Sequence, residues 1–144
     1  MTELGTDHAI ESLATRVLNG TLPKSEWTHA AHFALALWLL RHMPELAKPD
    51  AMREIIIALN YAHGTPNTES EGYHHTITIA SLRAARSMMV DAGADPEVTR
   101  VLARLLDSVF ARPEWIFAYW SPDLLFSAAA RREWIEPDIQ PLPF

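Results

Sequence analysis

The stretch at residues 30–40 constrains the fold of this chain more than any other part of the sequence. It reads AAHFALALWLL and puts apolar side chains on nearly every side of a helix. A helix that is hydrophobic all round has to be covered by other elements. Its longest strictly apolar run, residues 33–40, is about half of the ~18 residues typical of a membrane span. We therefore expect a buried central helix rather than a membrane helix.

Amphipathic segments on both sides of this stretch predict the helices that cover it. Start and stop signals bound five main helices: Thr6 or Asp7 to Gly20, Thr28 to Pro44, Pro49 to Gly64, Tyr73 to Gly93, and Asp95 to Val109. A shorter helical piece is predicted from Ser121 towards Trp134, and the proline-rich residues 137–144 are expected to lie extended over the bundle. The sequence thus predicts an all-α, single-domain helical bundle over residues 1–144, which is the length of one ordinary domain.

Composition and charge exclude several classes of partner. The 12 Lys and Arg residues against 18 Asp and Glu give a net charge of −6, which argues against nucleic acid as a partner. Because the chain has no cysteine, disulfides and cysteine-ligated metals are excluded. Residues 1–10 carry Glu3 and Asp7 where a signal peptide has positive charge. We expect a cytoplasmic protein without a membrane partner; homo-oligomer formation stays open.

Two histidines at the start of the central helix are the sharpest candidates for chemistry. His29 and His32 are three positions apart in the sequence THAAH, so their rings lie on neighbouring helical turns and can converge on one ion. Burying an imidazole is costly unless its nitrogens find partners. A purely structural interpretation also stands, in which both histidines make hydrogen bonds at the start of the helix.

A second pair, His74 and His75, opens the fourth predicted helix directly after a polar loop at residues 64–72. Helical spacing puts His74 on the face of Ile77, which we expect to point inwards. His75 shares its face with Arg86 and is expected to reach solvent or an outer partner. If the second and fourth helices are neighbours, His74 joins the first pair in one site.

Such a site supports two interpretations. Neutral imidazoles of His29, His32 and His74 suit a divalent transition metal (Zn, Fe, Ni or Mn) with an open position for a small-molecule reaction. Carboxylates of Glu26, Glu69 or Glu71 are further candidate ligands or bases. Alternatively, the helix N-termini and protonated histidines hold an anionic small ligand in a non-enzymatic module whose aromatic C-terminal region contacts a protein partner.

The other histidines and the aromatic residues near the C-terminus are expected to have structural roles. His8, His42 and His63 have no histidine partner at ligand spacing, so we expect them to have surface or loop roles. The aromatic cluster between Trp115 and Trp120 is expected to seal the core of the bundle, with lining a pocket or docking a partner as the alternatives.

Three short motifs extend this picture. The segments T-H-x-x-H (Thr28 to His32), G-Y-H-H-T-I-T (residues 72–78) and A-R-x-x-W-x-x-P-D (Ala130 to Asp138) resemble those of an uncharacterised family of small all-helical bacterial proteins. The resemblance implies that His29, His32 and His74 form the site. It further implies supporting or substrate-contacting roles for Tyr73, Thr76 and Arg131, and it places His75 where the family often has Glu.

Overall fold

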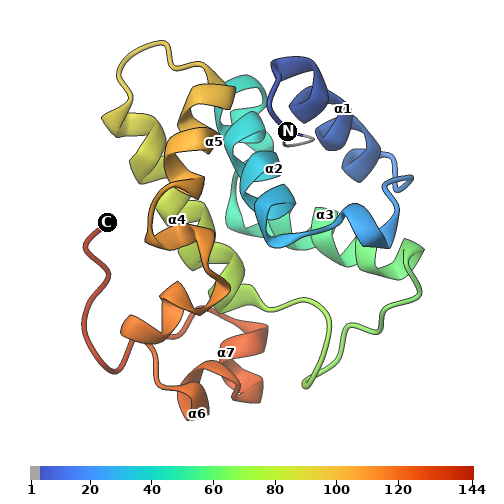
Figure 1. Ribbon diagram of the computed structural model, residues 1–144. Coiled ribbons are helices and arrows are strands. Elements are labelled where there is room, and N and C mark those ends of the chain that lie inside the picture. The colour runs from blue at the N-terminus through green and yellow to red at the C-terminus, as the bar shows by residue number, and fades with distance from the viewer. Residues whose placement is uncertain (1–3) are drawn as a thin grey trace.

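The computed structural model describes residues 4–144 and contains only helices and loops over that range (Figure 1). This confirms the all-α prediction. The long helices are α1 (Asp7–Leu18), α2 (His29–His42), α3 (Pro49–Ala62), α4 (His75–Asp91) and α5 (Val98–Leu106). Short α6 (Pro122–Leu125) and α7 (Ala128–Arg132) follow, together with the 3-10 turns η1 (Lys24–Glu26), η2 (Pro44–Leu46), η3 (Val109–Ala111) and η4 (Pro113–Ala118).

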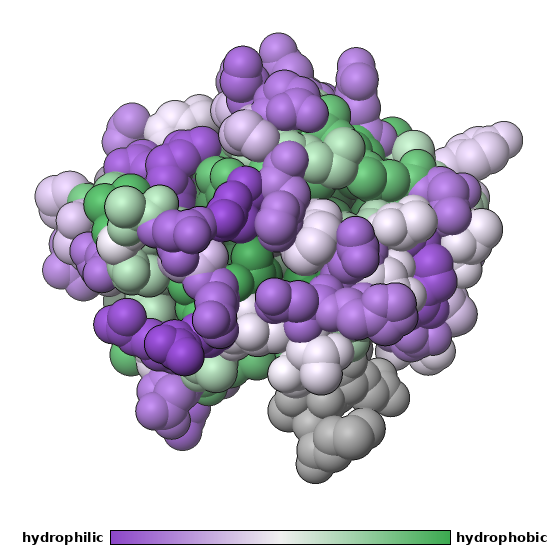
Figure 2. Space-filling model, turned by 90° about the horizontal axis from the view of Figure 1, so that it is seen from above, coloured by the Kyte–Doolittle hydropathy of each residue, from purple (hydrophilic) through white to green (hydrophobic). Residues whose placement is uncertain are grey.

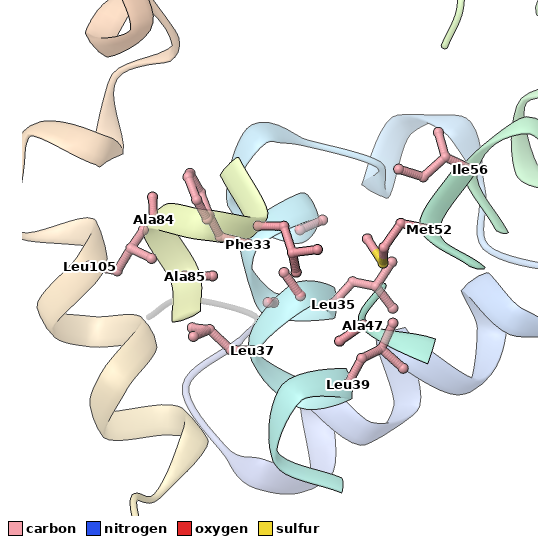
Figure 3. Close-up of a cluster of buried hydrophobic side chains, with 14 of the residues drawn as sticks. Phe33, Leu35, Leu37, Leu39, Ala47, Met52, Ile56, Ala84, Ala85 and Leu105 are labelled. Atoms are coloured by element: carbon pink, nitrogen blue, oxygen red, sulfur yellow. The ribbon is translucent and has the colours of Figure 1, made fainter. Parts of the chain in front are cut away.

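Helix α2 is the centre of the bundle, as its apolar sequence predicts. It contacts α1, α4 and α5, and Figure 1 shows it among these helices and α3. Its side chains Phe33, Leu35 and Leu37 are all fully buried. In Figure 3, Phe33 and Leu37 lie on the side of α4 and α5, whereas Leu35 lies on the side of Met52. The helix therefore buries opposite faces against different neighbours.

Side-chain caps place the starts of the first two helices where the sequence predicts them. Thr6 accepts a hydrogen bond from the Ala9 amide at the start of α1. Thr28 does the same for the Ala31 amide at the start of α2. Hydroxyl caps of this kind typically stabilise a helix by about 1 kcal/mol.

Helix α5 differs from its prediction at both ends. It begins at Val98 without a side-chain cap, because Asp95 instead pairs with Arg41 at the end of α2. It ends at Leu106, before the predicted end at Val109, whose side chain is 69% exposed. The hydroxyl of Ser108 accepts a hydrogen bond from a backbone amide and starts the separate turn η3 there.

The C-terminal part closes the lower end of the bundle in Figure 1. The helical piece predicted from Ser121 onwards is two helices, because the Ser127 hydroxyl caps α7 and starts it anew. Residues 137–144 contain no helix, as predicted, and Phe144 packs against Phe110 with ring centroids 5.6 Å apart. Trp120 is fully buried, so this part of the aromatic cluster seals the core.

None of the described helices is a candidate membrane span, and the surface is mostly polar in the view of Figure 2. No helix in residues 4–144 is long and apolar enough to cross a bilayer. Figure 2 shows one face of the molecule, where hydrophilic side chains surround smaller hydrophobic areas. Scattered exposed apolar side chains such as Val90, which is 71% exposed, are ordinary for a folded domain.

Asn67 ties the loop at residues 64–72 to the residues on either side of it. The Asn67 side-chain oxygen accepts hydrogen bonds from the Asn60 amide group and from the Tyr73 backbone amide, each at 3.0 Å. Gly72 has a φ of +84°, and a Cβ placed on it would lie 2.1 Å from the Pro66 carbonyl oxygen. The turn therefore needs glycine at this position to lead the chain into α4.

Gly72→Ala should destabilise the protein much more than Gly64→Ala. Gly64 also has a positive φ, +73°, but a Cβ there would have no atom within 4 Å. We expect Gly64→Ala to cost about 1 kcal/mol of conformational strain, and Gly72→Ala to cost more than about 2 kcal/mol because the backbone has to shift as well. Urea unfolding of both variants measures the difference. Equal losses would contradict this account of the loop.

Candidate ligand-binding site

A cavity of about 700 Å³ lies between α2, α3, α4 and the C-terminal elements η4 and α6. Its volume falls within the range of pockets that hold small organic ligands. Much of its wall is aromatic, with contributions from Trp27, Phe33, Trp115, Phe117 and Phe126. The described residues therefore contain a concave site of suitable size and largely apolar character.

The cavity brings the predicted histidines to one place. His29 and His32 line it from the start of α2, and Tyr73 and His74 line it from the segment that enters α4. His63, which we expected in a surface or loop role, lines the same cavity from the end of α3. Because α2 and α4 are neighbours, residues more than 40 positions apart share this wall.

The ring of His32 is fixed by its backbone and by an aromatic neighbour. Its Nδ1 donates a hydrogen bond of 2.7 Å to the Thr28 carbonyl oxygen. The ring also stacks on Trp27 with centroids 3.7 Å apart and planes inclined by 26°. Since Nδ1 carries the hydrogen, the neutral ring presents Nε2 as a hydrogen-bond acceptor. No residue in 4–144 makes a hydrogen bond to this nitrogen.

Burial keeps His32 uncharged. Desolvation by the surrounding protein is the main cause that lowers its pKa to about 4, and the nearby His29 also favours the neutral form. The hydrogen bond to Thr28 acts in the opposite direction but is the smaller effect. At pH 7 a group with this pKa is protonated in only about one molecule in a thousand. His32 is therefore an acceptor, not a cation.

Backbone carbonyls also orient the imidazoles of His29 and His63. His29 Nε2 donates to the Phe110 carbonyl oxygen at 2.7 Å. His63 Nε2 donates to the Leu22 carbonyl oxygen at 2.7 Å. The remaining nitrogen of each ring, Nδ1, has no hydrogen-bond partner among residues 4–144 and can accept a hydrogen bond when it carries no hydrogen.

His74 makes two hydrogen bonds that the sequence did not predict. Its backbone is extended, with φ −131° and ψ 108°, and its Nδ1 accepts a hydrogen bond of 3.2 Å from the Ile77 amide. Its Nε2 donates to the Leu125 carbonyl oxygen at 2.6 Å. Burial is the main cause that lowers the His74 pKa. His74 is therefore the N-cap of α4 and ties α4 to α6, with both nitrogens occupied.

His75 is buried and contacts a partner, which is the second of the two expected alternatives. It is 7% exposed, and its Nδ1 shares a hydrogen bond of 2.6 Å with the Tyr73 hydroxyl. Desolvation raises the Tyr73 pKa to about 12, so the phenol is neutral. Helical periodicity alone did not decide between solvent and a partner, because Tyr73 precedes the helix and folds its ring towards His75.

Thr76 and Arg131 do not line the cavity, but they make hydrogen bonds that support the segment leading into α4. The Thr76 hydroxyl donates to the Glu133 carbonyl oxygen at 2.8 Å and accepts from the Ile135 amide at 3.2 Å. Arg131 Nη1 donates to the Gly72 carbonyl oxygen at 3.1 Å. Both side chains connect the C-terminal segment to the start of α4.

The donor set does not fit the predicted metal centre. Residues 4–144 contain no group of three His, Asp or Glu side chains placed to hold a metal ion. His74 has no nitrogen left to coordinate one. Two of the candidate carboxylates are engaged elsewhere, Glu26 with Arg16 at 3.2 Å and Glu69 with Arg132 at 3.6 Å.

No family model matches the chain, and neither a curated protein nor a solved structure matches it.

Removing the His74 ring should destabilise the fold by roughly 2–4 kcal/mol, because His74→Ala loses a helix cap of about 1 kcal/mol and leaves a buried carbonyl without a donor at about 1–3 kcal/mol. His74→Asn supplies a side-chain oxygen that can cap α4, so it should lose about 1 kcal/mol less. Chemical unfolding of both variants tests this. If His74→Ala were as stable as the unaltered protein, the capping role would be wrong.

Proposed function

We propose that this chain is a small-molecule-binding protein that holds a neutral, largely apolar ligand in the cavity between α2, α3 and α4. The observation that carries the proposal is the cavity of about 700 Å³ with aromatic walls and imidazoles whose hydrogen-bonding nitrogens are fixed by backbone carbonyls. Side chains held in this way are preorganised, which reduces the entropic cost of binding a ligand.

The charges around the cavity favour a neutral ligand. His32 is uncharged at pH 7 because burial lowers its pKa to about 4, so it offers no positive charge to an anion. The Lys and Glu side chains of the lining, Lys24 and Glu114, have opposite signs and are exposed. An ion moved into an apolar site without a partner of opposite charge loses its hydration at high cost. The interpretation of an anion held by protonated histidines therefore receives no support from His32.

A metal ion is not part of this proposal, because the described residues supply no suitable set of three ligands. The proposal concerns binding alone. The sequence also predicts a small-molecule ligand, and we propose that this ligand binds in the cavity described above.

Filling the cavity should block binding. Ser81 and Ser87 are both partly buried on α4, but only Ser81 lines the cavity. We expect Ser81→Phe to weaken binding of the neutral fluorescent dye prodan at least about tenfold, because the larger side chain occupies part of the cavity. A tenfold loss of affinity corresponds to about 1.4 kcal/mol. Ser87→Phe is the matched control and should bind the dye as the unaltered protein does.

Dye titrations followed by fluorescence measure both affinities, with circular dichroism to show that each variant is folded. Equal dye affinity of the folded Ser81→Phe variant and the unaltered protein would contradict the assignment of the cavity as the binding site.

A further inference from the structure

We infer that the ligand is a neutral aromatic hydroxy compound whose O–H group donates a hydrogen bond to Nε2 of His32 while its ring packs against the aromatic wall. This inference rests on the proposed function and specifies the chemical class of its ligand. Three features of the cavity carry it: imidazole nitrogens without a hydrogen-bond partner, the position of His32 against Trp27, and the lack of a positive charge on His32.

Three of the imidazoles that line the cavity each offer a free acceptor nitrogen. His32 Nε2 has no partner among residues 4–144, and the same holds for Nδ1 of His29 and of His63. The hydroxyl of Thr78, in contrast, already donates to the His74 carbonyl oxygen at 2.8 Å. A ligand that pairs with one of these nitrogens therefore has to bring its own O–H or N–H donor.

His32 is held firmly enough to select such a donor. The Thr28 carbonyl oxygen accepts from the His32 backbone amide at 3.1 Å and from its Nδ1 at 2.7 Å. With the ring stacked on Trp27, Nε2 cannot exchange roles with Nδ1 without breaking a hydrogen bond. A ligand without a donor would cover this acceptor and leave it unpaired, and an unpaired buried polar group is costly.

The rest of the wall explains why the ligand should be flat and aromatic. Trp27, Phe33 and Trp115 present rings on the same cavity, and Phe117 and Phe126 pair with centroids 5.9 Å apart beside it. Aromatic rings pack favourably edge to face or with offset faces against one another. A fused aromatic ring with one hydroxyl group combines both requirements.

Three naphthalene derivatives of nearly equal shape test the inference directly. 2-Naphthol has the donor, 2-methoxynaphthalene lacks it, and 2-naphthoate replaces it with a negative charge. At pH 7 we expect 2-naphthol to bind about 10- to 100-fold more tightly than 2-methoxynaphthalene, in line with the cost of leaving a buried acceptor unpaired, and 2-naphthoate to bind no better than the ether. Calorimetric titration measures all three affinities.

Replacing the ring tests the role of His32 itself. His32→Phe keeps an aromatic ring next to Trp27 but removes the acceptor, so the preference for 2-naphthol over the ether should fall to less than about threefold, consistent with loss of one hydrogen bond. His42→Phe is the matched control, because His42 lies on the same helix, packs on Trp38 with centroids 3.9 Å apart, and does not line the cavity. This control should keep the full preference.

The outcomes separate the inference from the proposed function. If 2-naphthol and its methyl ether bind the unaltered protein equally well, or if the preference persists in His32→Phe, the hydroxy-compound inference is wrong while binding in the cavity stands. If none of the naphthalenes and no prodan binds, the proposed function fails as well. Preference for 2-naphthol that His32→Phe removes and His42→Phe keeps supports the inference.

Discussion

Burial of helix α2 on nearly all sides is the constraint on which the rest of this structure depends. Because Phe33, Leu35 and Leu37 face different neighbours and are all fully buried, the other helices have to surround α2. The start of α2 is less completely covered, and there its polar residues His29 and His32 lie beside the aromatic side chains of η4 and the entry to α4. The cavity is thus a consequence of how the bundle closes around the end of its central helix.

Histidines in an apolar wall have to satisfy at least one ring nitrogen, and backbone carbonyls do this throughout the cavity. His29 bonds to Phe110, His63 to Leu22 and His74 to Leu125, each joining segments that are at least 41 positions apart. These bonds hold separate elements together and at the same time fix which nitrogen carries the hydrogen. The same contacts therefore stabilise the fold and orient the ring nitrogens that the proposed ligand would contact.

The sequence was sufficient for the fold and for part of the site. Helical periodicity and local signals such as Thr6, Thr28 and Pro49 predict the starts of α1, α2 and α3, because these signals act within one helical turn. The role of His74 was not predictable in this way, since its cap bond is local but its second bond reaches α6. His63 was missed because only the tertiary fold brings the end of α3 to the cavity.

The measurement that tests the central claim most directly is the protonation state of the His32 ring. In ¹⁵N-resolved NMR spectra at pH 7, the account predicts a neutral ring with hydrogen on Nδ1 and none on Nε2, as the bond to the Thr28 carbonyl requires. It also predicts that this ring stays neutral until the pH approaches about 4. A ring that is charged at pH 7, or that carries its hydrogen on Nε2, would contradict the account.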